Sequence, residues 1–285
     1  MSRSIALLCC GCIVAIGATG YGMLGDPAIA DVAVPEQVGQ TAPKSDFARR
    51  IDMGRRSGKV ATMDEVVREL QERTRTSPED AEAWHLLASA ALSRLQTRTA
   101  LRGISVGKPL YDTLPTEVAA DVDLGLAAAD KARTLGDDSG DLYRLEAGLL
   151  GQRITGFSSA LQWNGRIQKA LAKAVELIPE QPKLHLALGL RKLLAPRFLG
   201  HDPAGALEHL QFAAEAMPDD ERPALFAAMA LYLQDKRQQA IVWLEQAVAR
   251  NPDNPFARAV LRRVQRDEQD PFGRDLTVAE IDAPR

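Results

Sequence analysis

The segment Glu221–Asn254 reads ERPALFAAMALYLQDKRQQAIVWLEQAVARNPDN. Small and apolar residues recur in it at spacings of three and four, which place them on one face of a helix. The first half carries Ala227, Ala228 and Leu231, and the second half carries Ala240, Leu244 and Ala247, followed by Pro252. Alanines at such positions let two helices approach closely, and the leucines fill the space beside them. The segment therefore predicts two helices packed together around a short turn.

The second half of this segment recurs upstream with the same spacing. The earlier copies begin at Ala206, Ala170, Ala128 and Val66, and each is followed by a proline or glycine. The preceding helices also match, with Trp84, Arg144 and His185 at equivalent positions. The alternation of Val, Ile and Thr that is typical of strands is absent, so we expect helices throughout. The sequence predicts an all-α chain built from a repeated helix pair.

Three insertions interrupt the repeat before its regular C-terminal end. The extra residues fall between Leu101 and Ala127, around Gly151–Gly165, and around Pro196–Asp202. Insertions in repeat proteins form loops on one face, which is often the face that binds a partner. We therefore expect these segments to be loops on a common face.

The pattern resembles the tetratricopeptide-repeat (TPR) family over residues 62–266. This resemblance implies an all-α, TPR-like helical solenoid of about four to five helix pairs, with insertions in the earlier repeats. The run Pro196–Asp202, which leads to Ala206 and Leu210, is also similar to the exported T component associated with tripartite periplasmic (TRAP) transporters. That subset has a Gly-Gly-Asp-like turn after the proline, where this chain has His201 in place of the second glycine. The second resemblance implies an envelope subunit that binds a small apolar ligand or a partner protein.

Residues 1–30 have the features of a secretory signal peptide. Arg3 precedes an apolar run from Ile5 to Ile16, and Ala28-Ile29-Ala30 provides a small-x-small exit. We expect cleavage after Ala30 and export to the periplasm or cell envelope. Two alternatives stay open, because the uncharged stretch Ile5–Leu24 is long enough for a retained anchor and Cys10 is a candidate for lipidation. All three cysteines, Cys9, Cys10 and Cys12, lie in this region, so the cleaved chain has none.

The rest of the chain divides into a linker, the repeat domain and a tail. Residues 31–61 carry Pro, Gly, Gln, Ser and scattered charges without an apolar period, which predicts a flexible linker. The repeat domain spans residues 62–266. Residues 267–285 are acidic and contain Pro271 and Gly273, which predicts a loose C-terminal tail. Its apolar residues, Leu276, Val278 and Ile281, could fold back onto the last repeat.

Composition and motifs exclude several classes of function. The chain of 285 residues has 35 basic and 38 acidic side chains, a charge of −3, which argues against a nucleic-acid binder. Gly103–Pro109 lacks the spacing and the Ser/Thr of a phosphate loop. The histidines, His85, His185, His201 and His209, offer no set of three convergent ligands, so we expect hydrogen-bonded side chains instead of a metal site. We therefore expect no enzyme, no cofactor and no metal.

The first helix of each pair lines the inner, concave face of a solenoid. The residues expected there are mostly apolar: Leu145, Leu149, Arg153, Leu186, Leu190, Leu193, Leu225, Met229 and Tyr232. Such a surface would exceed the apolar patch that a soluble monomer usually exposes, so we expect a cover. Three covers stay open: an insertion or the tail of the chain itself, an apolar small molecule or lipid, and a partner's amphipathic helix. Arg153, Arg191 and Arg197 are expected near the rim, where they could orient a carboxylate.

These observations favour a non-enzymatic scaffold for protein–protein interaction in the cell envelope, with the concave face as the binding site. The alternative is a subunit that binds a small apolar ligand or lipid and serves a TRAP-type periplasmic transporter. In both cases we expect contact with a membrane only through a retained N-terminal anchor.

Overall fold

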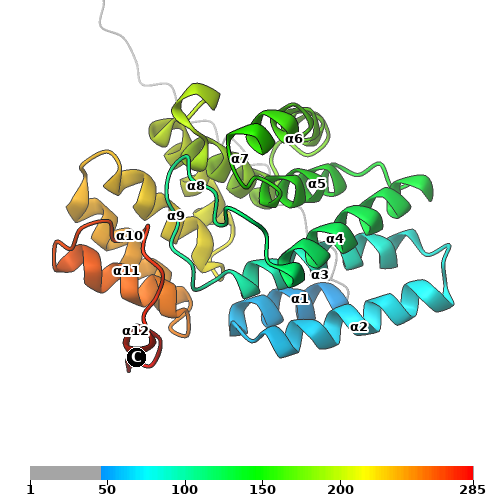
Figure 1. The fold of residues 1–285 in the computed structure, drawn as a ribbon, viewed down its shortest axis with the longest axis horizontal. Helices are drawn as coiled ribbons and strands as arrows, with labels where there is room; N and C mark the ends of the chain where they lie inside the picture. Colours follow the sequence, from blue (N-terminus) through cyan, green and yellow to red (C-terminus); the bar gives the residue numbers. More distant parts are fainter. Residues whose placement is uncertain (1–45, 285) are drawn as a thin grey trace, which may run out of the picture. The chain divides into compact units, whose positions relative to one another are not determined.

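The computed structural model describes residues 46–284, and in this range every regular element is a helix. The signal-peptide prediction and the three cysteines lie outside the described residues. The elements are α1 (Asp46–Ser57), α2 (Val60–Thr76), α3 (Ala81–Arg98), α4 (Thr116–Thr134), α5 (Gly140–Gln152), α6 (Phe157–Leu177), α7 (Pro182–Leu194), the 3-10 turn η1 (Arg197–Leu199), α8 (Pro203–Ala216), α9 (Glu221–Tyr232), α10 (Arg237–Arg250), α11 (Pro255–Gln265) and α12 (Val278–Ile281) (Figure 1). The all-α prediction is confirmed. Over residues 46–284, no helix combines the length and apolar character needed to cross a bilayer.

The helices pack as the predicted pairs. Helix α3 packs on α4, α5 on α6, α7 on α8, and α9 on α10, and most pairs also contact the next pair along the chain (Figure 1). The repeated small and apolar positions of the second helices lie in the core. Ala128, Ala170, Ala206 and Ala240 are all nearly inaccessible to solvent, and so are the residues four positions later. The fold is therefore a TPR-like helical repeat. Leu177, a repeat position at the end of α6, departs from this rule because it is 40% exposed.

Two glycines show how closely the helices cross. A Cβ atom on Gly189 of α7 would lie 2.7 Å from Cγ of Leu210, and one on Gly125 of α4 would lie 2.7 Å from Cδ2 of Leu149. Side chains at either position would force neighbouring helices apart, since a buried core has no free volume.

The linker predicted for residues 31–61 is wrong over its described part. Helix α1 spans Asp46–Ser57, packs on α2 and α3, and buries Ile51. A Cβ atom on Gly54 would lie only 2.6 Å from the sulfur of Met63, so the close approach of these two residues requires glycine at this position. Gly58, with φ of 66°, then makes the left-handed turn into α2. Because α1 is the first helix of the pair that Val66 belongs to, the repeat domain begins before residue 62.

The C-terminal tail is folded back, which corrects the expectation of a loose segment. Phe272 is buried and its ring centroid lies 5.7 Å from that of Tyr232. Arg263, only 2% exposed, donates hydrogen bonds to the carbonyl oxygens of Pro271, Arg274 and Asp275 and forms an ion pair with Glu280. These bonds fix the backbone of the tail, and Leu276 packs against the core while Val278 stays exposed.

Candidate functional site

The apolar residues expected to line an open inner groove lie mostly in the core. Leu145, Leu149, Leu186, Leu193, Leu225 and Met229 are at most 5% exposed, and Leu190, Tyr232 and Arg153 are half-buried. Leu145 and Leu149 pack with residues of α2, α3 and α4. The other apolar residues, from Leu186 to Tyr232, share one cluster with Ile104 and Val106 of the first insertion and with Leu276 of the tail.

The chain itself therefore covers the inner apolar face. The backbone N–H of Gly107 donates to the carbonyl of Leu194 at 3.1 Å, and that of Ile104 donates to Phe272 at 2.7 Å. The N–H of Leu276 donates to the carbonyl of Leu101 at 3.0 Å, which joins the tail to the same insertion. Of the three expected covers, the structure has the first over the part of the face formed by Leu186, Leu193, Leu225 and Met229, which Ile104, Val106 and Leu276 pack against.

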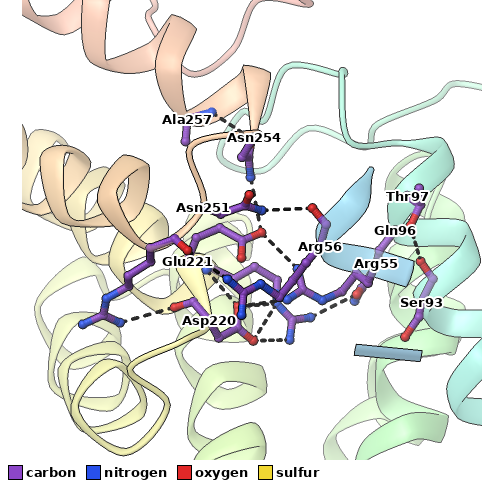
Figure 2. Close-up of polar contacts among 12 residues, drawn as sticks. Arg55, Arg56, Ser93, Gln96, Thr97, Asp220, Glu221, Asn251, Asn254 and Ala257 are labelled. Atoms are coloured by element: carbon purple, nitrogen blue, oxygen red, sulfur yellow. Dashed lines mark hydrogen bonds and ion pairs between the residues drawn. The ribbon is translucent and has the colours of Figure 1, made fainter. Parts of the chain in front are cut away.

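A polar network joins the first helix to the last repeat (Figure 2). We call its residues, Arg55, Arg56, Asp220, Glu221 and Asn251, the polar clasp. Arg55 donates to Glu221 at 3.0 Å and to Asp220 at 3.3 Å, and these three side chains are 8%, 3% and 13% exposed. Arg56 donates to the carbonyl of Arg250, and Asn251 donates back to the carbonyl of Arg56 (Figure 2).

The charges of the clasp compensate for its burial. Burial alone would raise the pKa of Asp220, but the guanidinium groups of Arg222 and Arg55 outweigh it and hold this pKa well below its usual range. Glu221 also accepts from Asn254, whose side chain caps α11 through Ala257 (Figure 2). Because its side chains bond to one another and to the neighbouring Arg222, Arg250 and Asn254, the clasp has the character of a structural closure.

His85 lies between two carboxylates, Asp137 at 2.7 Å from Nδ1 and Asp141 at 3.1 Å from Nε2. Burial lowers the pKa of His85, but the hydrogen bonds and charges of Asp141 and Asp137 outweigh it, so the net shift is upward. Both ring nitrogens are thus occupied by structural partners, and neither is left to act on a substrate.

The other histidines are also hydrogen-bonded. Nδ1 of His209 lies 3.1 Å from Nδ1 of His185, whose Nε2 bonds to the carbonyl of Pro179. His201 bonds to the carbonyl of Leu193. Over the part of the chain that the structure describes, no three His, Cys, Asp or Glu side chains are placed to hold a metal.

The three insertions converge on one surface. Gly107 of the first lies against Pro196 of the third, where a Cβ would be 3.4 Å from the Pro196 Cα. Phe157, in the second, meets Phe198, in the third, with ring centroids 5.5 Å apart and planes tilted by 49°. These contacts agree with the expectation that the insertions share a face, although the second begins as helix α6 and not as a loop.

Three large apolar side chains of this surface are exposed to solvent. Phe157, Leu161 and Phe198 are 64%, 53% and 61% exposed. Phe157 and Leu161 are four residues apart on α6, so they lie on one helix face. We call these three residues the insertion patch. Leaving two large aromatic side chains mostly in water is costly, so the patch is a candidate interaction surface.

An open hollow of about 450 Å³ adjoins the patch. Phe198 forms part of its lining, together with Val106, Gly107, Pro196, Arg197, His201 and Leu233. The hollow thus combines apolar walls with one exposed guanidinium and one imidazole.

The three arginines expected at a rim have different environments. Arg153 pairs with Asp123 and lies over the ring of Trp163. Arg191 donates to the side-chain oxygen of Asn164 at 2.9 Å. Arg197 is exposed and has no ion pair with a described residue.

Phe157, Leu161 and Phe198 were not among the residues predicted for the site. The signal for the two phenylalanines lay in composition, because aromatic residues are only 5% of the chain and four of them, Tyr111, Phe157, Trp163 and Phe198, fall inside insertions. Aromatic side chains in segments outside the repeat have no repeat-to-repeat packing position to fill, so they are candidates for a binding surface.

Comparisons with known proteins add little to this geometry. No family model and no curated protein matches the sequence. Among solved structures, the chain is similar to MamA, with 13% identity over 73% of this chain and 96% of MamA and a TM-score of 0.37. It is also similar to YrrB, described as a TPR protein with an unusual peptide-binding site, with 15% identity over 75% of this chain and 96% of YrrB and a TM-score of 0.38. The TPR-like repeat is established by the chain's own helix pairs.

Proposed function

We propose that the chain is a non-enzymatic scaffold that binds a protein partner through the insertion patch. The observation that supports this is the solvent-exposed contact between Phe157 and Phe198, built from two separate insertions of the repeat. Exposed aromatic anchors next to a hollow are typical of residues that carry most of the binding energy at an interface. The repeat core supplies a rigid support, since both insertions are anchored on α5 to α8.

The patch is favoured over the inner face for a physical reason. A partner at the inner face would have to displace the first insertion and the tail, and their backbone hydrogen bonds would be lost. The patch needs no such rearrangement because its side chains already face water.

The experiment compares the wild-type chain with a Phe157→Ser/Phe198→Ser variant. Val242→Ser is the matched control, because Val242 is 53% exposed on α10, outside both insertions. Each tagged chain is incubated with an extract of its own cells, and retained proteins are quantified by mass spectrometry. We expect at least one protein to be retained by wild type and control and lost from the double variant. Equal retention by all three chains would refute the patch as the docking site.

A second candidate function is binding of a small apolar ligand with an acidic group. The hollow of about 450 Å³ beside Arg197 favours it, and its volume lies within the usual range of ligand pockets. Native mass spectrometry after mild purification would detect a retained ligand. The association with a TRAP-type transporter rests on the resemblance of Pro196–Asp202 alone.

We further propose export to the periplasm or cell envelope, on the strength of the sequence of residues 1–30. Cell fractionation and the mass of the purified chain test this, because loss of residues 1–30 indicates cleavage after Ala30. An intact N-terminus in a membrane fraction indicates the retained anchor, and an added lipid mass indicates lipidation.

A further inference from the structure

The face of α6 that bears the insertion patch lacks a packing partner. Helix α6 packs closely on α5 but makes few contacts with α7, unlike the close packing of α2 on α3 or of α8 on α9. Phe157, Leu161 and Asn164 follow one another at spacings of four and three, so they form a single stripe on α6. Phe198 meets one end of the stripe and Arg191 meets the other end, at Asn164. Leu161 therefore lies exposed between an aromatic pair and a guanidinium.

Three cations near this stripe form no ion pair with a described residue. Arg191 and Arg197 form no ion pair with any residue in the range 46–284, and neither does the exposed Lys108 next to Gly107. Burial lowers the pKa of Arg191 because it disfavours the charged guanidinium. No carboxylate of the described chain raises this pKa again.

The acidic groups near these cations already have partners. Asp202 caps α8 and pairs with Lys192 at 3.1 Å. Asp123 pairs with Arg153. The surface around the stripe is thus left with an excess of positive charge, in a chain whose net charge is −3.

We propose that the insertion patch binds a partner's protein segment that presents acidic and apolar side chains together. This proposal rests on the proposed function and specifies the chemistry of its partner. The apolar side chains pack on Phe157, Phe198 and Leu161, and the carboxylates pair with Arg191 and Arg197. Guanidinium groups suit this role because they can bind a carboxylate through two hydrogen bonds.

The length of the stripe limits the size of the segment. From Phe157 to Asn164 the α6 axis rises about 10 Å, which matches two turns of helix or about three residues of extended chain. A short motif is therefore enough, and the partner need not be a folded domain.

The experiment selects peptides on the full chain. A phage library of random peptides, each about a dozen residues long to exceed the stripe, is selected on wild type and depleted on the Phe157→Ser/Phe198→Ser variant. The enriched peptides are synthesised and their Kd values are measured by fluorescence anisotropy. The tested chains are wild type, Arg197→Gln, Arg191→Gln/Arg197→Gln, and the control Arg49→Gln, whose arginine is 63% exposed on α1. Arg197 is exposed, so its single variant keeps the test valid if the double variant folds poorly.

We expect enriched peptides that combine Asp or Glu with Leu, Phe or Trp. Their Kd should rise about tenfold in the double variant, as expected for lost charge pairs, and should not change in Arg49→Gln. Neutral or basic peptides whose Kd is unaffected by either arginine variant would overturn this inference and leave the proposed function standing.

Two further outcomes count against the proposal. Failure to enrich any peptide that depends on the two phenylalanines would overturn the proposed function as well. If the chain binds phosphatidylglycerol vesicles through the same phenylalanines and no peptide is enriched, the ligand of the patch is a membrane surface and not a protein segment.

Discussion

Removal of the Arg55 side chain should lower the free energy of unfolding of the described domain more than removal of any exposed arginine side chain. Its side chain is 8% exposed and serves two carboxylates, those of Asp220 and Glu221, which are 13% and 3% exposed. Breaking a buried ion pair by deleting one partner typically costs about 3 to 5 kcal/mol, because the other charge stays buried. Asp220 keeps Arg222 as a partner, whereas Glu221 keeps the hydrogen bond from Asn254. We therefore expect Arg55→Ala to cost about 3 kcal/mol, the lower end of that range.

The assay is urea unfolding followed by circular dichroism and tryptophan fluorescence, because agreement of the two probes tests two-state behaviour. Arg49→Ala is the control, since its pair with Asp46 is exposed and should contribute less than about 1 kcal/mol. A double-mutant cycle with Arg55→Met and Glu221→Gln isolates the coupling between the two side chains. A cost for Arg55→Ala equal to that of the control, together with zero coupling, would refute the clasp as the contact that holds α1 on α9.

Three further perturbations test the packing, a histidine and the tail. Gly125→Ala should destabilise the fold by about 1 to 3 kcal/mol through overpacking. Gly165→Ala has open space around the new methyl group and should stabilise α6 by about 0.5 to 1 kcal/mol. Urea unfolding measures both changes, and equal effects of the two variants would contradict the close helix crossing at Gly125. His85 has a raised pKa, so its charged form stabilises the fold at low pH and this contribution is lost as pH rises through the folded-state pKa. His85→Gln should therefore lower the free energy of unfolding more at about pH 5.5 than at about pH 8.5, as measured by urea titrations. A loss of stability that is the same at both pH values would contradict this prediction. Arg263→Ala should free the tail, which trypsin would then cut at Arg274 faster than in wild type; unchanged cleavage would show that other contacts hold it.

The helix pairs could be predicted because their cause is local. Small residues at three- and four-residue spacing define a helix face, and Ala206 or Ala240 can be recognised without knowing what lies opposite. Gly54 stands twelve residues before Val66, as Ala228 stands twelve before Ala240, and this spacing could have revealed α1.

The other elements depend on contacts between distant parts of the sequence. Helix α1 has few apolar residues, and its last turn is held by carboxylates 165 and 166 residues away. The tail is ordered by Arg263, whose bonds go mostly to backbone carbonyls that no sequence pattern marks.

The site was only partly predictable for the same reason. The inner positions, such as Leu186 and Met229, were identified as apolar, but the insertion and tail that bury them could not be placed from local spacing. The three insertions were expected to share a face, and the structure brings them together. The meeting of Phe157 with Phe198 joins two separate insertions, so it could be found only in three dimensions.

Hydrogen–deuterium exchange with a bound partner tests the central claim most directly, because it reports on the patch and on the inner face in one experiment. The account predicts slower exchange in residues 157–164 and 196–201 when the partner or a selected peptide binds, with no change in α9. Protection confined to α7 and α9, together with faster exchange in residues 101–110, would show that the partner enters the inner face by displacing the insertion, and it would contradict the account.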